Sequence, residues 1–263
     1  MMTRFHKMHG LGNDFVMFDA RTAPVSLTPE RVRAIADRRT GVGCDQLIVL
    51  EPSDQADLKM RIFNADGGEV GACGNAARCV ALLVGGDLRI ETLGGFISGA
   101  STYDGVTIDL GQPRFAPEEI PVLYPMDTRR MPVGWEGLAE PLAVNVGNPH
   151  LVFFVGDEGA VELGRIGPTI ERDPLFPEGV NVNVATVVAG AVRLRTWERG
   201  AGLTPACGTG ACATAIAAIA LKLLPSPVEV RQIGGVLSVA WAPGETVRMT
   251  GPAVHVFSGE IEL

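Results

Sequence analysis

The pattern of hydrophobic and polar positions along this chain is mostly that of β-strands. Runs in which apolar and polar residues alternate are typical of strands that bury one face. Such runs lie at residues 4–9, 15–19, 46–51, 58–64 and 106–110 in the first half, and at 144–146, 151–155, 182–188, 192–197, 236–241 and 246–249 in the second. The pattern therefore predicts a fold dominated by sheet.

Three helices are also predicted. Thr28-Pro29-Glu30 begins one, because it offers a capping side chain, a proline at the first helical position and an acidic first turn, and Gly41 follows its end. Two more are predicted over residues 74–84 and 208–224, where Ala, Leu, Val and Ile recur on every face. Helices that are apolar all round are buried rather than amphipathic, so we expect both in a core.

The two apolar helical runs belong to a repeat. Ala-Cys-Gly occurs at residues 72–74 and again at 206–208, each time between a strand-like run and a helical run. The positions that match at an offset of 134 or 135 residues include Arg61 with Arg195, Asn64 with Glu198, and Gly12-Asn13 with Gly147-Asn148. A period this long excludes a solenoid and suggests a duplicated unit, with Cys73 and Cys207 at corresponding points. The predicted architecture is a curved antiparallel sheet around a central helix, made twice.

Composition and charge exclude several classes of protein. The 263 residues are 46% hydrophobic and 20% charged, which is ordinary for a packed soluble protein. A net charge of −8 argues against general nucleic-acid binding, which needs clustered basic residues. The longest apolar stretch, residues 211–224, is too short to span a membrane, and residues 1–12 do not resemble a secretory signal. We expect a cytoplasmic protein that binds neither nucleic acid nor membrane.

The five cysteines do not indicate a disulfide framework or a metal site. An odd number in a chain of this kind argues against paired disulfides. No two cysteines form a Cys-x-x-Cys pair, and the four histidines are scattered, so no metal is expected. Cys44, Cys79 and Cys212 are interpreted as small buried hydrophobic residues.

Cys73 and Cys207 are instead candidate acid–base groups. A thiol at a helix N-terminus lies near unpaired N–H groups and the positive end of the helix dipole, which favours the thiolate. The same N–H groups can hold a carboxylate. If both helix starts faced one amino acid, one thiolate could remove the α-proton while the opposite thiol returned one, which inverts the configuration. Such chemistry needs no cofactor in principle. A pyridoxal route is disfavoured because the only lysines, at 7, 59 and 222, lie outside the duplicated segments.

These segments resemble one known family closely. Residues 7–15 (KMHGLGNDF), 71–79 (GACGNAARC), 198–202 (ERGAG) and 206–210 (ACGTG) are similar to diaminopimelate epimerase motifs, and the resemblance covers nearly the whole chain. It implies a cofactor-independent, two-base interconversion of LL- and meso-2,6-diaminopimelate that feeds lysine and peptidoglycan synthesis. It also implies an α+β fold of two pseudo-symmetric barrel domains, and usually a homodimer. The implied domains are residues 1–118, joined by a C-terminal strand at about 250–263, and residues 119–249.

The resemblance also assigns roles to individual residues. Cys73 and Cys207 would be the catalytic bases, and His150 and Glu198 would tune the acidity of the thiols. The implied substrate-binding residues are Asn13, Gln46, Asn64, Gly74, Asn75, Asn148, Asn181, Glu198, Arg199, Gly208 and Thr209. Arg199 suits a bidentate grip on a distal carboxylate, while Glu198 and asparagine carbonyls can accept from an ammonium group.

The chain departs from the family pattern at three positions, and two other functions stay open. Leu203 stands where the family usually has Glu, Pro205 precedes the second Ala-Cys-Gly, and Phe257 replaces a tyrosine often found at the dimer contact. One alternative is a related racemase acting on proline or hydroxyproline, although such a substrate has no distal charges for Arg199 and Glu198 to meet. The other is a redox sensor that uses Cys73 and Cys207 as a reversible disulfide.

Overall fold

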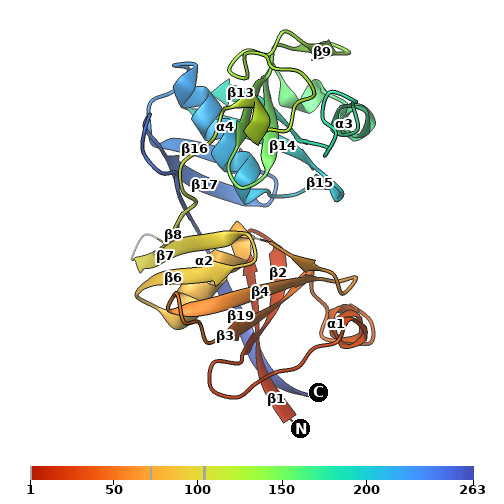
Figure 1. Cartoon of the computed structure of the whole chain (residues 1–263), viewed down its shortest axis with the longest axis vertical. Coiled ribbons are helices and arrows are strands. Elements are labelled where there is room, and N and C mark those ends of the chain that lie inside the picture. The colour runs from red at the N-terminus through yellow and green to blue at the C-terminus, as the bar shows by residue number, and fades with distance from the viewer. Residues whose placement is uncertain (1, 72, 103–104) are drawn as a thin grey trace. The chain divides into compact units, whose positions relative to one another are not determined.

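The structure is a computed structural model that describes residues 2–71, 73–102 and 105–263 (Figure 1). Ala72, which belongs to the first Ala-Cys-Gly, lies outside the described residues. Contacts within the chain divide it into two compact units. We call Met1–Asp109 with Thr250–Leu263 the N-unit, and Leu110–Met249 the C-unit.

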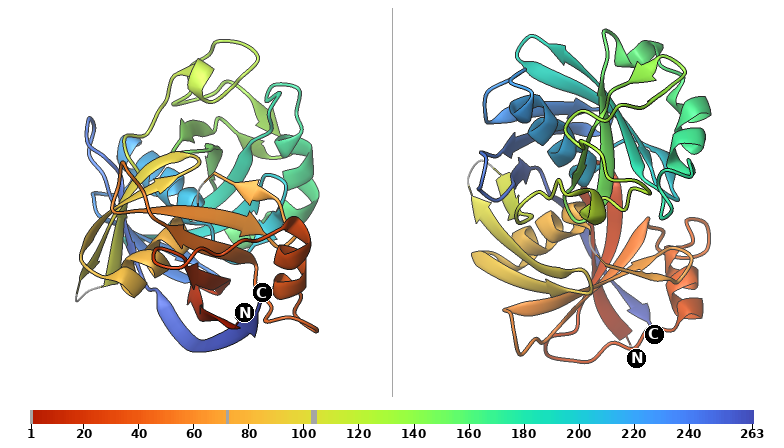
Figure 2. Two further views of the ribbon diagram at one scale, coloured as in Figure 1. Left: turned by 60° about the horizontal axis from the view of Figure 1, so that its bottom comes forward. Right: turned by 45° about the horizontal axis from the view of Figure 1, so that its top comes forward.

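The N-unit is a curved sheet with one helix inside it and one outside. Its strands are β1 (Met2–Gly10), β2 (Asn13–Asp19), β3 (Gln46–Glu51), β4 (Leu58–Asn64), β5 (Glu69–Val70), β6 (Asp87–Thr92), β7 (Gly95–Thr102), β8 (Gly105–Asp109) and β19 (Val254–Glu262). Its helices are α1 (Pro29–Ala36) and α2 (Gly74–Val84). The C-terminal strand β19 pairs with β1, so Met2 lies opposite Glu262 and the two ends of the described chain meet (Figure 2).

The C-unit repeats this plan. Its strands are β9 (Gly134–Trp135), β10 (Leu138–Ala139), β11 (Leu142–Asn145), β12 (Pro149–Phe154), β13 (Asn181–Val188), β14 (Ala191–Glu198), β15 (Gly202–Thr204), β16 (Val228–Gln232) and β17 (Gly235–Ala240), and β18 (Arg248–Gly251) spans the boundary. Its helices are α3 (Leu163–Glu171), α4 (Gly208–Ala220) and the short η1 (Pro117–Glu119) and η2 (Glu158–Ala160).

Both sheets are mixed, with the same order of strand directions. In the N-unit, β1–β2, β3–β4 and β6–β7 are antiparallel, whereas β2–β3 and β4–β6 are parallel. In the C-unit, β11–β12, β13–β14 and β16–β17 are antiparallel, whereas β12–β13 and β14–β16 are parallel. The expected α+β class is confirmed, but the expectation of purely antiparallel sheets was wrong. Each parallel pair is joined by a helix, because parallel strands need a crossover connection.

The predicted apolar helices form the centre of each unit. Helix α2 begins and ends where the pattern predicts, and α4 begins at Gly208 and ends at Ala220. Ten of the thirteen residues of α4 are buried, as expected for a helix that is apolar all round. The sequence did not predict α3, because Pro168 lies inside this helix and Glu162, at the N-cap position, is not a typical capping residue.

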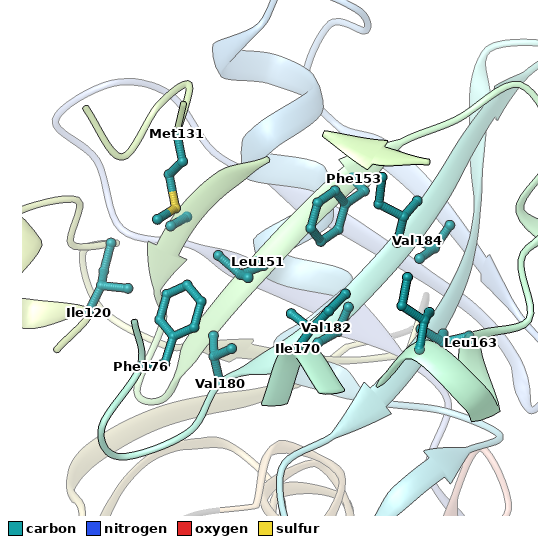
Figure 3. Close-up of a cluster of buried hydrophobic side chains, with 13 residues drawn as sticks. Ile120, Met131, Leu151, Phe153, Leu163, Ile170, Phe176, Val180, Val182 and Val184 are labelled. Atoms are coloured by element: carbon teal, nitrogen blue, oxygen red, sulfur yellow. The ribbon is translucent and has the colours of Figure 1, made fainter. Parts of the chain in front are cut away.

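The proline-rich stretch of residues 113–141 is packed rather than a free linker. Ile120, Met131 and Leu138 are almost fully buried in the core of the C-unit, where they join Leu151 and Phe153 of β12 (Figure 3). Trp135 and other partly buried side chains pack against the same cluster. The prolines shape this segment, but its apolar residues anchor it in the C-unit.

Candidate functional site

Cys73 stands immediately before α2, as the repeat predicts. Its backbone is extended (φ −149°, ψ 110°), and Gly74 begins the helix. The half-buried thiol is directed at Asn13, with 3.8 Å between Sγ and Oδ1. In the part of the chain that the structure describes, the Cys73 side chain makes no capping bond to its own helix. The first N–H groups of α2 have no acceptor within the helix, so Gly74 and Asn75 supply donors beside the thiol.

A chain of side-chain hydrogen bonds holds Asn13 in place. Asn75 donates from Nδ2 to Asn13 Oδ1 (3.2 Å), and Asn13 donates from Nδ2 to Asp45 Oδ2 (3.0 Å). The fully buried Arg78 donates from Nη2 to Asn75 Oδ1 (2.7 Å). Arg38 donates to the other oxygen of Asp45 (2.7 Å). With its amide held from both sides, Asn13 presents its carbonyl oxygen to Cys73.

Gln46 and Asn64 form a second polar pair of the N-unit. They lie opposite each other on β3 and β4, and Gln46 donates from Nε2 to Asn64 Oδ1 (2.9 Å). Gln46 Oε1 is buried and has no hydrogen-bond partner among the described residues. Gln46 also lies beside Phe15 in the parallel β2–β3 pair, so this pair and Asn13 share one end of the sheet. The structure therefore gathers the predicted site residues of this half.

Cys207 occupies the corresponding position before α4, but its surroundings differ. It is buried, its backbone is extended (φ −125°, ψ 115°), and Sγ accepts from the Gly210 N–H at 3.3 Å. Thr209 Oγ1 lies 3.5 Å from the sulfur. Burial and then the nearby charge of Glu198 raise the pKa of the Cys207 thiol well above its usual value, against the opposite effect of the bonds from Thr209 and Gly210.

Two further side chains support this thiol. Thr204 on β15 donates from Oγ1 to Glu198 Oε1 (2.5 Å), which fixes the carboxylate at the end of β14. Gln232, the last residue of β16, accepts the backbone N–H of Cys207 on Oε1 (2.7 Å). The exposed Leu203 takes no part in these bonds, whereas Thr204 next to it holds Glu198.

His150 is a buried neutral group. Its Nε2 lies 2.9 Å from Asn148 Oδ1 and its Nδ1 lies 3.0 Å from Asn183 Nδ2. The asparagine oxygen can only accept and the amide nitrogen can only donate, so the proton belongs on Nε2. Burial lowers the pKa of His150 to about 3, so it carries no charge at neutral pH. Thr196 donates to Asn183 Oδ1 (3.0 Å) and completes the network.

Gly210 lets α4 start against this network. A Cβ added to Gly210 would lie only 2.7 Å from Asn183 Oδ1, which is closer than such contacts occur in proteins, and 3.0 Å from Thr196 Oγ1, which is a tight contact. The absent side chain therefore allows the N-terminus of α4, and with it Cys207, to pack directly on β13 and β14.

Asn181 and Arg199 meet at the same end of β13 and β14, beyond Asn183 and Thr196. Asn181 accepts the backbone N–H of Arg199 (2.9 Å) and donates to the Pro149 carbonyl (2.7 Å). Arg199 uses Nη1 to donate to the carbonyls of Glu178 (2.7 Å) and Gly179 (3.4 Å). Its Nε and Nη2 have no partner among the residues that the structure describes, so they remain able to bind an anion in the bidentate manner of arginine.

The strand register shows that the predicted site residues form matched pairs. In the N-unit, Gln46 pairs with Phe15 on one side and with Asn64 on the other. In the C-unit, Asn181 pairs with His150, and on its other side the next pair along is Val182 with Trp197, so Asn181 lies beside Glu198. The equivalent positions are Asn13 with Asn148, Gln46 with Asn181, Asn64 with Glu198, Cys73 with Cys207, and Asn75 with Thr209. Each unit thus places its own strand members at one end of its sheet.

Sequence reasoning missed four residues that support these groups: Asp45, Asn183, Thr204 and Gln232. The first three had a signal, because Asp45 and Thr204 adjoin motif residues and Asn183 interrupts an apolar strand. Gln232 had none, since it lies 25 residues after Cys207 and contacts it only through the fold.

The remaining cysteines are buried away from these contacts. Burial raises the pKa of both Cys44 and Cys79 to about 12, and Cys212 is fully buried, so their interpretation as core residues is confirmed. None of the five cysteines, all of which the structure describes, forms a disulfide. Within the described residues, no three His, Cys, Asp or Glu side chains lie close enough together to hold a metal ion. No helix in the described part of the chain is both long and apolar enough to cross a membrane.

The two-unit fold is shared with solved proteins of distant sequence. A phenazine biosynthesis protein of the PhzF family from Enterococcus faecalis has a similar fold over 100% of both chains, with a TM-score of 0.73 and 16% identity. A hydroxyproline epimerase from Agrobacterium vitis, solved with bound trans-4-hydroxy-L-proline, has a similar fold over 99% of this chain and 92% of its own, with a TM-score of 0.66 and 16% identity. At such identities the likeness shows the fold alone.

The sequence comparisons identify the family. The family model described as diaminopimelate epimerase matches residues 5–116 and 142–256. A diaminopimelate epimerase from Rhizorhabdus wittichii is 63% identical over 100% of this chain and 97% of its own, and one from Sphingopyxis alaskensis is 60% identical over 100% and 98%. The chain therefore belongs to the diaminopimelate epimerase family.

Proposed function

We propose that this protein is an isomerase that interconverts LL- and meso-2,6-diaminopimelate, for lysine and peptidoglycan synthesis. Membership of the family and full-length relatives at 63% and 60% identity support this substrate. The observation that carries the mechanism is the placement of Cys73 and Cys207 at the starts of equivalent helices in two units of the same topology. A redox sensor or a proline-type racemase is not favoured, because diaminopimelate epimerases match this chain over its whole length at 63% and 60% identity.

The proposed mechanism uses one thiol as base and the other as acid. One thiolate takes the α-proton and becomes a thiol, while the other thiol gives its proton to the opposite face of the carbon and becomes a thiolate. This exchange requires the two sulfurs to reach opposite faces of one α-carbon. N–H groups of Gly74, Asn75, Gly208 and Thr209 would stabilise the charge that develops on the carboxylate. No cofactor takes part in this scheme.

The matched polar residues would select the rest of the substrate. Arg199 would bind the distal carboxylate through its Nε and Nη2, and Glu198 would accept from the distal ammonium. Gln46 would accept from an ammonium group through its buried Oε1, which has no partner among the described residues. The other proposed substrate contacts are Asn13, Asn64, Asn148 and Asn181. Buried polar groups left unpaired by the wrong stereoisomer would give the discrimination.

The proposal extends to the organisation of the protein. We take the two units to be two domains, and we expect a homodimer and a cytoplasmic location. The exposed apolar side chains of β19, Val256 (53% exposed) and Phe257 (47%), support a contact with a second copy. Five free cysteines suit a reducing compartment.

Solvent deuterium incorporation at the α-carbon tests the proposed function. The native protein should incorporate deuterium while it inverts either stereoisomer. Cys73→Ala and Cys207→Ala should each abolish inversion, because both thiols are needed. Each variant should still exchange the α-hydrogen of one stereoisomer with retention, and the two variants should prefer opposite stereoisomers. Inversion that persists in either variant would refute the two-base mechanism, and a native protein that exchanges neither isomer would refute the function.

A further inference from the structure

Gln232 ties the strand pair β16–β17 to the start of α4. It is the last residue of β16 and faces Gly235 across the turn. Its Oε1 accepts the backbone N–H of Cys207 (2.7 Å), and the neighbouring Gly234 N–H donates to the Pro205 carbonyl (2.7 Å). Two hydrogen bonds from one turn therefore hold the segment that leads into Cys207.

The backbone N–H of Cys207 needs this acceptor. Ala206 and Cys207 are only 9% and 3% exposed, so water has little access to the backbone N–H of Cys207 as a hydrogen-bond acceptor. As the residue before the first helical turn, Cys207 uses its carbonyl but not its N–H in the ladder of α4. A backbone N–H can only donate, so the amide of Gln232 has to present its oxygen.

This orientation of the Gln232 amide leaves its nitrogen without a hydrogen-bond partner among the described residues. With Oε1 turned to Cys207, Gln232 Nε2 is buried. An unpaired buried donor is unfavourable. Turning the amide round would place its NH2 against the Cys207 N–H, with donor facing donor. The bond to Cys207 therefore decides the orientation of this side chain.

We infer that Gln232 is a positioning residue for the Cys207 thiol. This role of Gln232 rests on the proposed function and deepens it, because Gln232 would act through Cys207 and would not touch the substrate. The bond to the N–H fixes the backbone of Cys207 on one side, and the Gly210 N–H holds Sγ on the other (3.3 Å). Held at both points, the thiol keeps the direction that proton transfer requires.

The corresponding turn of the N-unit is built differently. Thr92 faces Gly95 as Gln232 faces Gly235, and the Gly94 N–H donates to the Gly71 carbonyl (2.8 Å) as Gly234 does to Pro205. The Thr92 hydroxyl, however, donates to Gly95 O (2.8 Å) and accepts from Gly94 N (3.2 Å) within its own turn. The backbone anchor is shared by both units, whereas Thr92 directs its side chain to its own turn and Gln232 directs its side chain to Cys207.

Three substitutions in the full-length protein test the positioning role of Gln232. Gln232→Leu removes the acceptor without adding charge, and we expect kcat to fall about 10- to 100-fold with KM changed less than about twofold, because a misplaced reacting group costs rate rather than binding. Gln232→Glu keeps an acceptor but adds a negative charge, so kcat should fall less and alkylation of Cys207 should shift to higher pH. Gln55→Leu removes an exposed glutamine amide from a loop of the N-unit and should change neither.

A comparison in single-cysteine backgrounds separates a local role from general damage. In Cys73→Ala, where only Cys207 can exchange the α-hydrogen, Gln232→Leu should slow exchange by the same 10- to 100-fold. In Cys207→Ala, where only Cys73 can do so, it should have no effect. Equal losses in both backgrounds, or no loss in either, would overturn the inference.

Alkylation by iodoacetamide, followed by mass spectrometry of each cysteine peptide, gives a readout that needs no activity. Gln232→Leu should speed the reaction of Cys207 by about tenfold relative to Cys73, because the buried segment is released. An unchanged ratio of the two alkylation rates would contradict the positioning role of Gln232 even if the native protein proved to have another substrate. Conversely, a native protein without α-hydrogen exchange would refute the proposed function while leaving this ratio to decide the role of Gln232.

Discussion

The starts of α2 and α4 have the same backbone but different chemistry. Both follow a cysteine with extended backbone and both open with Gly, yet Cys73 turns its thiol to Asn13 while Cys207 accepts from the N–H of Gly210 in its own helix. One turn further on, α2 carries the fully buried Arg78 where α4 carries the buried Cys212. Equivalent positions thus hold a cation in one unit and a neutral side chain in the other.

The last residues of β4 and β14 differ in charge in the same direction. Asn64 in the N-unit is neutral, whereas its equivalent in the C-unit is Glu198, whose charge adds to burial in raising the pKa of Cys207. A duplicated fold keeps the hydrogen-bonded framework because the backbone geometry depends on it. The polar side chains at the helix starts are free to diverge, and they give two equivalent thiols unequal surroundings. In the proposed mechanism the two thiols share one proton, and these surroundings would influence which of them holds it.

The largest effect is expected at Gly210, which has Ala76 as its equivalent in α2. Gly210→Ala would push a methyl group against Asn183 and Thr196, displace the start of α4, and lower kcat/KM by about 100-fold. The reverse change, Ala76→Gly, should cost about 1 kcal/mol of stability and little activity. Steady-state kinetics and thermal unfolding measure both. Comparable activity losses would show that the two helix starts are not as different as we describe.

A smaller effect is expected from exchanging the charge at the equivalent strand positions. Glu198→Gln removes the anion near Cys207, so the pKa of this thiol should fall and its alkylation rate should rise about tenfold at a fixed pH near neutrality. Asn64→Asp adds an anion to the N-unit and serves as the converse. Rates for each cysteine peptide between pH 6 and 10 (about four units) resolve the two sites. If Glu198→Gln leaves the profile of Cys207 unchanged, the charge of Glu198 has no part in setting the acidity of this thiol.

The acid stability of the two units should also differ. Burial acts to raise the pKa of Asp14, but hydrogen bonds from Arg38 and Lys7 prevail and hold it at about 2, below the unfolded value of about 4. A carboxyl group with a lowered folded pKa stabilises the fold above pH 4 and loses that contribution as the pH falls toward 2. The equivalent C-unit position, one strand residue before His150, is Pro149, which cannot titrate.

Hydrogen exchange of β1–β3 amides, compared with tryptophan fluorescence from the C-unit, measures this difference. Asp14→Asn should destabilise the N-unit by about 1–2 kcal/mol at pH 7 and flatten its acid dependence. Asp19→Asn, which loses a more exposed pair with Arg21, is the matched control and should cost less. An acid transition that is identical in native and Asp14→Asn proteins would exclude this carboxylate as its source.

The smallest effect concerns the two outer helices. Thr28 caps α1 by accepting the Arg31 N–H (3.3 Å), whereas Glu162 makes no capping bond to α3 among the described residues. Thr28→Ala should therefore cost about 1 kcal/mol in urea unfolding, and Glu162→Ala should cost almost nothing. Equal costs would mean that the cap of α1 has no part in the difference between the helices.

Local signals explain what could be predicted. The start of α1 followed from its cap and proline, α2 and α4 followed from alanine-rich runs without a polar face, and the two cysteines followed from the repeated tripeptide. Each signal lies within a few residues of the feature that it specifies. The α3 helix was missed because its ends carry no such signal and Pro168 interrupts it, so packing of its apolar face, not propensity, stabilises it.

The sequence by itself determined the starts of α1, α2 and α4, the duplication, the two thiols and the family. Tertiary structure alone decided the parallel strand pairs, the burial of the proline-rich stretch, the neutral His150 and the bond that the Cys207 N–H donates to Gln232. Strand direction depends on where a crossover helix delivers the chain. A pKa or a hydrogen bond depends on atoms that only folding brings within a few ångströms, however far apart they lie in the sequence.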